Sequence, residues 1–400
     1  MTTQANRWLL PDGVDEMLPP FANHLEQLRR EILDLYQGFG YELIKTPLIE
    51  FLDSLLILPS AELQLSTFKL VDQLSGKTMG VRADISSQAA RIDAHVLQRA
   101  GISRLCYADS VLHTRPRGPL GSRCPQLVGA ELYGHGGSDS DVEVIGLLLR
   151  TLRIAGVEQV LLTLGHNQLC RQLLGAAALP AELSSRLFAA LQNKATADLD
   201  HLLQGAAVPA ALVPVFKALP TLHGDASTLH RARALFNPLP APLREALEGA
   251  LHPLETIATR LGVEFPEQAL YFDLCEQRGY DYHTGVIFSA YVSGHGEAIA
   301  NGGRYDAIGE VFGRARPATG FDADLKTLLR LSSRDFSSAT RIYAPAGGDA
   351  ALARQVAQLR AQGNAVVQGF DDDPASARAQ GCTALLRRSA DGAWHLDMIT

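Results

Sequence analysis

The chain has 400 residues, of which 46% are apolar and 20% are charged, so it can bury the core of a globular protein with about two to three domains. The net charge of −7 lowers the expectation of nucleic-acid binding, because proteins that grip a polyanion usually carry a basic surface. The 5 cysteines are widely spaced and form no C-x-x-C pair, which argues against a disulfide framework and a structural zinc site. Without a signal peptide or an apolar run of about 20 residues, the sequence predicts a cytoplasmic protein with no membrane span.

Hydrophobic spacing and turn residues predict helices and strands in the first 155 residues. In the first helix, Leu25, Leu28, Ile32 and Leu35 recur at helical spacing, and charged residues fall between them. A later helix begins at Ser86, which can cap it. In chain order, the expected elements are a helix at 25–36, an extended stretch at 41–47, a hairpin at 68–82, a helix at 86–100, strands at 106–112 and 126–133, and a helix at 139–155.

The composition changes at about residue 166, where Leu and Ala dominate and prolines interrupt short helical stretches. This pattern predicts a helical insertion at about 166–265 within a core domain of residues 1–331. Strands are expected again at 269–276 and 285–292, and a helix is expected at 319–331.

A polar stretch follows the core. Residues 332–340 are rich in serine and are predicted to form a linker. Residues 341–400 then have the pattern strand, helix, strand, helix, strand, strand. That order predicts a small α/β domain at the C-terminus.

Charged, glycine and tyrosine residues gather in three segments within sequence that otherwise resembles strands: 81–91, 107–131, and 278–285 together with 301–306. A sheet that presents Asp84, Glu131, Arg278 and Tyr282 together would bind a small zwitterion. Its carboxylates would take the ammonium group, and its arginine would take the carboxylate. The alternative is an internal salt-bridge network, or residues scattered over separate surfaces.

The other sequence patterns do not indicate a catalytic or ligand-binding site. Gly302-Gly303-Arg304 lacks the spacing of a phosphate-binding loop, so we expect a turn with positive φ angles there. No metal site, cofactor or catalytic triad is predicted. The histidines that would suggest a metal are dispersed and lack an i, i+4 pair: His113, His166, His283 and His295.

The order of these segments resembles histidyl-tRNA synthetase, a class II aminoacyl-tRNA synthetase, over residues 8–331. The resemblance implies an α+β fold, with an antiparallel sheet flanked by helices, a helical insertion and a small C-terminal α/β unit similar to a reduced anticodon-binding domain. The matching segments are 41–50 for the dimer-forming motif 1, 107–131 for motif 2, 320–328 for motif 3, Arg278-Gly-Tyr-Asp-Tyr282 for the histidine-specific segment, and Gly302-Gly-Arg-Tyr-Asp306 for an identical family sequence.

The departures from the synthetase concern ATP. The resemblance places His113 where motif 2 has an ATP-binding arginine, and Arg115 where it has a glutamate. Thr327 stands where motif 3 has a second such arginine. A largely neutral imidazole and a hydroxyl cannot replace two guanidinium charges on a triphosphate, so we expect that the chain forms no histidyl-adenylate and has no catalytic residue.

The amino-acid side of the synthetase pocket is better retained. Asp84 replaces a glutamate, Ser86 a threonine and His283 a tyrosine. The family's glutamine aligns with Leu127, one residue from Gln126, which leaves the role of Gln126 open. The resemblance thus implies a histidine-binding set of Asp84, Ser86, Arg123, Gln126, Glu131, Arg278, Tyr282 and His283.

A synthetase-like core that keeps this pocket and loses its ATP arginines resembles the regulatory subunits of ATP phosphoribosyltransferase. That family implies a short-form catalytic subunit as partner, a hetero-octamer, a homodimer through motif 1, and L-histidine as a possible effector. Histidine would bind in the vestigial pocket or at the subunit interface. The alternatives are an active histidine–tRNA ligase and a tRNA- or amino-acid-binding paralogue with a signalling role, although the acidic balance and short C-terminal unit disfavour tRNA.

Overall fold

The computed structural model describes residues 8–57, 61–116, 118, 121–205, 208–276, 283–336, 340–390 and 392–399. The chain divides into two compact units, Met1–Ser333 and Arg334–Thr400. Within the described ranges, no helix is both long enough and apolar enough to cross a bilayer.

The first unit is built on a sheet that has nine strands within the described residues, in the order β1-β5-β6-β12-β11-β10-β7-β9-β8. In that order the strands are β1 Glu42–Leu43, β5 Ser103–Ser110, β6 Gln126–Tyr133, β12 Ala318–Asp324, β11 Ala300–Arg304, β10 Val286–Tyr291, β7 Leu161–His166, β9 Ala269–Asp273 and β8 His223–Gly224. Pairing from β5 through to β7 is antiparallel, whereas β1 with β5 and β7 with β9 are parallel pairs. The predicted antiparallel sheet is therefore confirmed, with parallel pairs toward its two ends.

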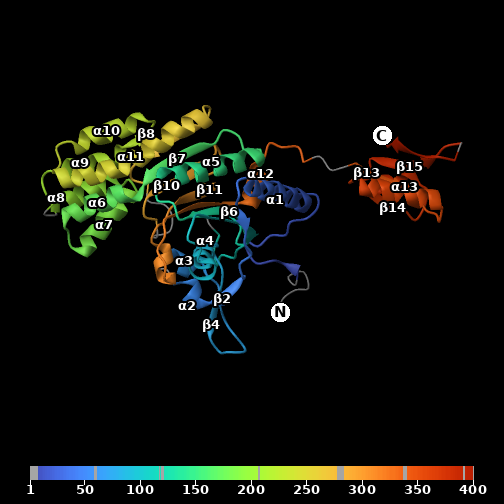
Figure 1. Cartoon of the computed structure of the whole chain (residues 1–400), viewed down its shortest axis with the longest axis horizontal. Coiled ribbons are helices and arrows are strands. Elements are labelled where there is room, and N and C mark those ends of the chain that lie inside the picture. Colours follow the sequence, from blue (N-terminus) through green and yellow to red (C-terminus); the bar gives the residue numbers. More distant parts are fainter. Residues whose placement is uncertain are drawn as a thin grey trace. The chain divides into compact units, whose positions relative to one another are not determined.

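Helices cover one face of this sheet (Figure 1). Helices α1 (Phe21–Gly38), α5 (Ser138–Ile154) and α12 (Leu325–Leu331) all pack on it or on one another. The predicted apolar stripe of α1 is confirmed, because Leu25 and Ile32 are buried. Burying this stripe and the matching face of α5 stabilises the central strands that carry the polar residues described below.

The predicted helix at 319–331 is wrong in its first half. Residues 318–324 form β12, a central strand paired with β6 on one side and β11 on the other. A strand buried on both faces shows no clear alternation of apolar and polar residues, and most residues of β12 other than Phe321 are small, so periodicity could not separate strand from helix. Asp324 ends the strand and caps α12 by accepting a hydrogen bond from the main-chain nitrogen of Lys326. Strand β7 was not predicted either.

The predicted turn at Gly302-Gly303 is also wrong. Both glycines lie in β11, and neither has a positive φ angle. Their role is close packing: a Cβ on Gly302 would collide with the ring of Phe288, and one on Gly303 would lie 2.8 Å from the carbonyl oxygen of Val286. Only glycine therefore fits at these two central positions.

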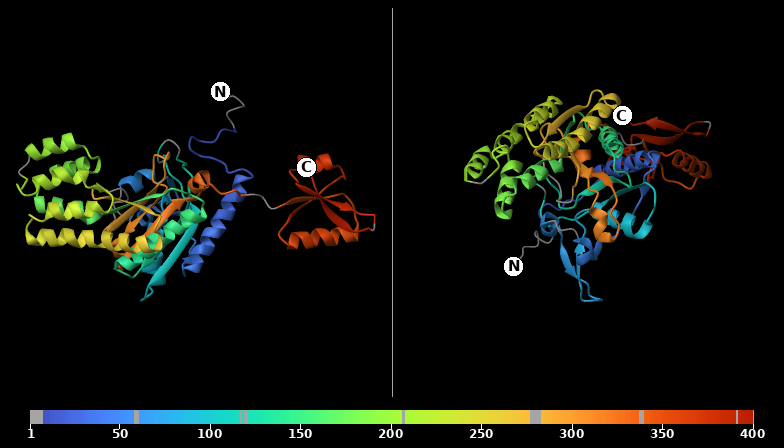
Figure 2. Two further views of the ribbon diagram at one scale, coloured as in Figure 1. Left: turned by 90° about the horizontal axis from the view of Figure 1, so that it is seen from above. Right: turned by 60° about the vertical axis from the view of Figure 1, so that its left-hand side comes forward.

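Between β7 and β9 the chain forms a group of helices, which Figure 2 shows stacked side by side. They are α6 Asn167–Ala177, α7 Ala181–Gln192, α8 Thr196–Gly205, α9 Val213–Ala218, the 3₁₀ helix η3 Leu219–Thr221, α10 Ser227–Phe236 and α11 Ala241–Glu264. We call this group the insertion. Its helix α11 packs on α5, α6 and α10, and so joins the insertion to the sheet.

A smaller sheet of order β2-β4-β3 includes the predicted hairpin, which projects from the unit in Figure 1. Its strands are β2 Ile49–Phe51, β3 Lys69–Val71 and β4 Thr78–Val81. The neighbouring helices are α2 Leu52–Leu55, α3 Ala61–Ser66, α4 Ser86–Arg91, the π-helix η2 Ile92–Leu97 and the 3₁₀ helix η4 Ile308–Phe312.

The second unit has a four-stranded sheet of order β14-β13-β15-β16 within the part of the chain that the structure describes. Its elements are β13 Arg341–Ala344, α13 Ala350–Ala361, β14 Ala365–Gln368, α14 Pro374–Ala379, β15 Ala384–Arg388 and β16 Trp394–Met398. Ile342 and Ala344 pack under α13, and Tyr343 packs with α14. Because neighbouring residues of a strand face opposite ways, the two helices cover opposite faces.

Candidate functional site

Glu131 lies in the middle of β6 and is completely buried. Its Oε1 accepts hydrogen bonds from the hydroxyl of Ser86 at 2.6 Å and from that of Tyr107 at 3.1 Å. Its Oε2 accepts a hydrogen bond from the hydroxyl of Tyr305. Three hydroxyl groups from α4, β5 and the end of β11 thus surround one carboxyl group.

A second carboxyl group lies close to the first. Asp84 is 3% exposed, and its Oδ1 accepts a hydrogen bond from the main-chain nitrogen of Ser86 at 3.3 Å. The pKa of Glu131 is raised to about 8, mainly by burial; the hydrogen bonds from Ser86 and Tyr305 oppose this shift, and the charge of Asp84 adds to it. A buried pair of carboxyl groups favours a bound cation, because a positive charge stabilises both ionised forms.

Glycines on neighbouring strands make room for these side chains. Leu105 and Gly320 lie opposite Glu131 on the two flanking strands. A Cβ on Gly320 would collide with the carboxyl group of Glu131, and one on Gly129 would collide with the ring of Tyr107. The floor of the site therefore depends on small residues that face large ones across the strands.

His283 joins this group through Tyr305. The two rings meet edge-on with their centroids 6.5 Å apart, and His283 is 8% exposed. Two other residues of the predicted histidine set, Arg278 and Tyr282, lie outside the described residues. The structure therefore brings Asp84, Ser86, Glu131 and His283 together.

Gln126 and Arg123 have other surroundings. Gln126 and Glu131 are five positions apart in the regularly paired strand β6, so their side chains point to opposite faces of the sheet. Leu127 instead shares the face of Glu131. Arg123 donates hydrogen bonds to the carbonyl oxygens of His113 and Asp12, both at 3.1 Å, and so ties the N-terminal segment to the loop after β5.

A cavity of about 290 Å³ lies over the face of the sheet that carries Glu131. Both His113 and Thr327 line it. The His113 Nε2 atom lies 2.9 Å from the carbonyl oxygen of Ala83, and the Thr327 hydroxyl donates to Asp324 Oδ2 at 2.8 Å. Within the described part of the lining, the acidic residues are Glu297, Asp322 and Asp324, and the strongly basic residue is Arg330.

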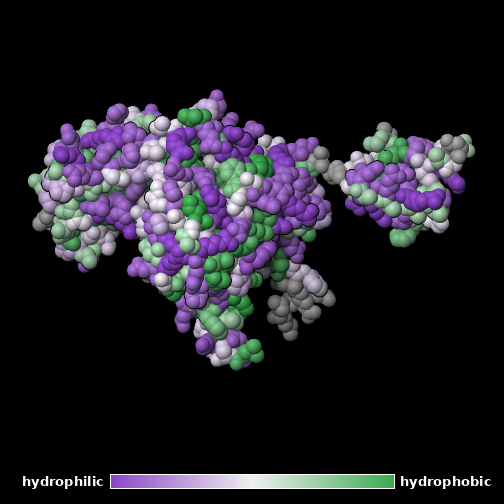
Figure 3. Space-filling view, in the orientation of Figure 1, coloured by the Kyte–Doolittle hydropathy of each residue, from purple (hydrophilic) through white to green (hydrophobic). Residues whose placement is uncertain are grey.

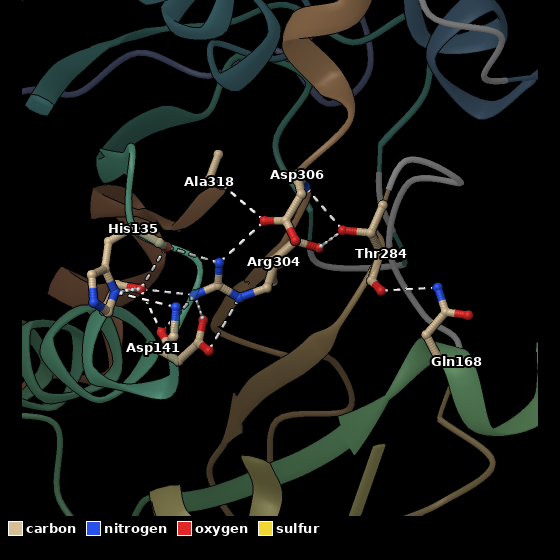
Figure 4. A network of polar contacts seen from close by, with 9 residues as sticks. His135, Asp141, Gln168, Thr284, Arg304, Asp306 and Ala318 are labelled. Atoms are coloured by element: carbon tan, nitrogen blue, oxygen red, sulfur yellow. Dashed lines mark hydrogen bonds and ion pairs between the residues drawn. The ribbon is translucent and has the colours of Figure 1, made fainter. Parts of the chain in front are cut away.

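Arg304, from the identical family sequence, is a structural residue (Figure 4). Its guanidinium group is paired with the buried Asp141 at 2.9 Å and donates to the carbonyl oxygens of His135 and Gly137, both at 3.1 Å. This buried arrangement anchors the end of β11 to the start of α5. Tyr305, the next residue, consequently faces Glu131 on the other side of the strand.

Sequence reasoning missed Tyr107 and Tyr305 as members of the site. The place of Tyr107 follows from strand alternation only once β5 and β6 are paired in register, which puts it on the face of Glu131, and Tyr305 lies just beyond the end of β11. Among the residues that the structure describes, no three His, Cys, Asp or Glu side chains are grouped so that they could hold a metal ion.

Comparisons with known proteins agree with this architecture. The sequence profile of the histidyl-tRNA synthetase family matches residues 13–328, and the profile of the ATP phosphoribosyltransferase subunit HisZ C-terminal domain matches residues 339–397. A solved ATP phosphoribosyltransferase regulatory subunit/histidyl-tRNA synthetase from Bacillus halodurans has a TM-score of 0.82 and 25% identity, covering 95% of this chain and 97% of that chain. A histidyl-tRNA synthetase from a Nostoc species has a TM-score of 0.77 and 17% identity, covering 98% of this chain and 97% of its own, and shares the fold.

Relatives found by sequence comparison share a higher identity with this chain than these solved structures do. The ATP phosphoribosyltransferase regulatory subunit of Thioalkalivibrio sulfidiphilus is 50% identical over 98% of this chain and 98% of its own length. The regulatory subunit of Pseudomonas fluorescens is also 50% identical, with 98% of each chain covered. The matches span both units, including the C-terminal one. The chain therefore belongs to the family of ATP phosphoribosyltransferase regulatory subunits, whose core has the histidyl-tRNA synthetase fold.

Proposed function

We propose that the chain is a regulatory subunit without a catalytic centre of its own, and that it assembles with a short-form ATP phosphoribosyltransferase catalytic subunit for the first step of histidine synthesis. The observation that carries this proposal is the 50% identity to named regulatory subunits over 98% of both chains. The profile match of residues 339–397 to the HisZ C-terminal domain supports the same assignment for the second unit.

The lining of the cavity supports the absence of adenylate chemistry. His113 and Thr327, which stand at the two positions that the resemblance gives to ATP-binding arginines, line one and the same cavity. Among the described residues, three carboxylic residues and one arginine line the cavity, and this balance of charge is unfavourable for a triphosphate. A ligase would need fixed positive charge there to stabilise the phosphates in the transition state. An active histidine–tRNA ligase is therefore the less favoured function.

The buried carboxyl pair supports histidine as effector. The charge of Asp84 acts on Glu131, and Glu131 accepts hydrogen bonds from the hydroxyls of Ser86, Tyr107 and Tyr305. The ammonium group of an amino acid would bring a positive charge next to these carboxyl groups. Histidine would inhibit the complex by binding one of its conformations more tightly than another, because only differential affinity shifts an equilibrium. The subunit interface is the alternative location for the histidine site.

Self-association through the motif 1 region is part of the proposal, within a hetero-octamer that includes the catalytic subunit. Four large apolar side chains in and beside residues 41–50 are between 44% and 49% exposed: Leu43, Leu48, Ile49 and Phe51. In Figure 3, hydrophobic surface gathers over the lower part of the core, above the projecting hairpin. Exposed apolar groups concentrated in this way favour burial against a second copy of the chain.

Reconstitution tests the function. The purified chain is mixed with a short-form catalytic subunit, and transferase activity is measured with and without histidine. We expect activity to rise on mixing and to fall when histidine is added. ATP–pyrophosphate exchange and tRNA charging by the chain alone serve as controls, and both should be absent. Unaided charging of tRNA, or a catalytic subunit that is indifferent to the chain, would overturn the proposal.

A further inference from the structure

Helix α6, the first helix of the insertion, begins against the residues that lead into β10. Asn167 Nδ2 donates a hydrogen bond to the carbonyl oxygen of His283 at 2.5 Å, and the main-chain nitrogen of Asn167 donates to the carbonyl oxygen of Gly285 at 2.9 Å. Gln168 Nε2 donates to the carbonyl oxygen of Thr284 at 3.0 Å (Figure 4). One turn of a helix thus holds three consecutive carbonyl groups.

The insertion also holds the chain at the end of β9. Lys194, in the turn between α7 and α8, pairs with the buried Asp273 at 2.5 Å. The main-chain nitrogen of Leu274 donates to the carbonyl oxygen of Leu222 at 3.1 Å, and the thiol of Cys170 lies 3.8 Å from the carbonyl oxygen of Leu274. Residues on both sides of 277–282 are therefore fixed to the insertion.

A chain of contacts connects these residues with the carboxyl groups of Glu131 and Asp84. His283 packs edge-on against Tyr305, and Tyr305 donates to Glu131. The hydroxyl of Thr284 accepts a hydrogen bond from the main-chain nitrogen of Asp306 at 2.9 Å, one residue beyond Tyr305. Because the surroundings are closely packed, a displacement of the three carbonyl groups would move the His283 ring and the main chain beside Tyr305.

We infer that the insertion is a positioning element for the amino-acid pocket, with Asn167 and Gln168 acting through His283 and Thr284 on Tyr305. Occupation of the pocket and the conformation of the insertion are then coupled, and the coupling acts in both directions. The identity of the ligand as histidine rests on the proposed function, whereas the positioning contacts do not depend on it. The insertion would accordingly transmit occupancy of the pocket to whatever contacts its outer surface.

The test uses the full chain and the variants Asn167→Ala and Gln168→Ala, with Gln172→Ala on the exposed side of the same helix as matched control. Titration calorimetry measures histidine affinity, and hydrogen exchange measures protection of residues 283–286. Each positioning variant should weaken histidine binding about five- to tenfold, as expected for the loss of one hydrogen bond that is buried at Asn167 and partly buried at Gln168. Exchange at 283–286 should rise, exchange in β5 and β6 should not change, and the control should behave as the natural chain does.

The outcomes separate the two proposals. If the natural chain binds histidine and the positioning variants bind it as tightly as the control does, the inference is overturned and the proposed effector remains. If the natural chain binds no histidine, the proposed effector fails, and hydrogen exchange decides the inference. Faster exchange at 283–286 in both positioning variants supports it in that case, and unchanged exchange overturns it. Histidine should also slow exchange in the first turn of α6 and around Lys194.

Discussion

Replacing Glu131 by glutamine should remove a pH dependence of the stability of the empty protein. Burial raises the pKa of Glu131 from its ordinary value of 4.5 to about 8. The folded chain therefore binds this proton more tightly than the unfolded chain does, so the stability contribution is fully present below pH 4.5 and is lost as the pH rises toward 8. Integrating the two titrations between pH 5 and pH 8 gives a loss of roughly 3 kcal/mol. Glutamine has the same shape and no proton to lose.

The assay is urea unfolding at pH 5, 6.5 and 8, followed by circular dichroism, on the natural chain and on Glu131→Gln. The second unit contributes equally to both proteins, so the difference between their free energies of unfolding isolates the first unit. That difference should move in favour of the variant by roughly 3 kcal/mol from pH 5 to pH 8. The exposed Glu267→Gln substitution serves as control and should show no such trend. A difference that stays constant across the three pH values would refute the reasoning about the buried carboxyl group.

Three further predictions concern the effector, the anchor and the dimer. Histidine affinity, measured by calorimetry from pH 6.5 to pH 8, should rise by up to about tenfold per pH unit, because a bound cation requires the carboxylate form of Glu131. In Glu131→Gln the affinity should not change with pH in this way. Arg304→Met should lower the free energy of unfolding by about 3–5 kcal/mol, because it leaves the buried Asp141 without its guanidinium partner, and an unchanged urea midpoint would contradict the structural role. Ile49→Asp should convert the isolated chain from dimer to monomer in sedimentation experiments, whereas Val263→Asp, on the exposed insertion, should not.

Local patterns were sufficient to predict the elements whose burial is one-sided. Helix α1 and the hairpin of β3 and β4 were found because apolar spacing or flanking turn residues mark them directly. Strand β12 was interpreted as helix because both of its faces are covered and, apart from Phe321, most of its residues are small. Periodicity reports a difference between two faces, and a strand in the centre of a sheet has none.

The candidate site shows a different limit of prediction from sequence. The sequence placed Asp84, Ser86 and Glu131 in one set through the resemblance, and their contacts follow from the pairing of β5 and β6 and from the start of α4. Tyr107 was missed because its membership depends on which residues lie opposite one another. Gln126 was included in the set although it lies on the other face of the sheet, because a shift of one residue along a strand turns a side chain to the other face.

Three glycines of the central sheet show both limits of prediction from sequence, the one for buried strands and the one for strand register. Gly303 was expected in a turn, Gly129 in a strand and Gly320 in a helix, but each lies in a strand where a large side chain occupies the space above it. The occupant belongs in every case to another element: Tyr107 over Gly129, His283 beside Gly303, and Glu131 over Gly320. A pocket floor of this kind is a property of strand register and not of any single segment. Alanine at Gly320 should therefore disturb Glu131 directly, although the two residues are far apart in the chain, and it should do so without changing any charge in the site.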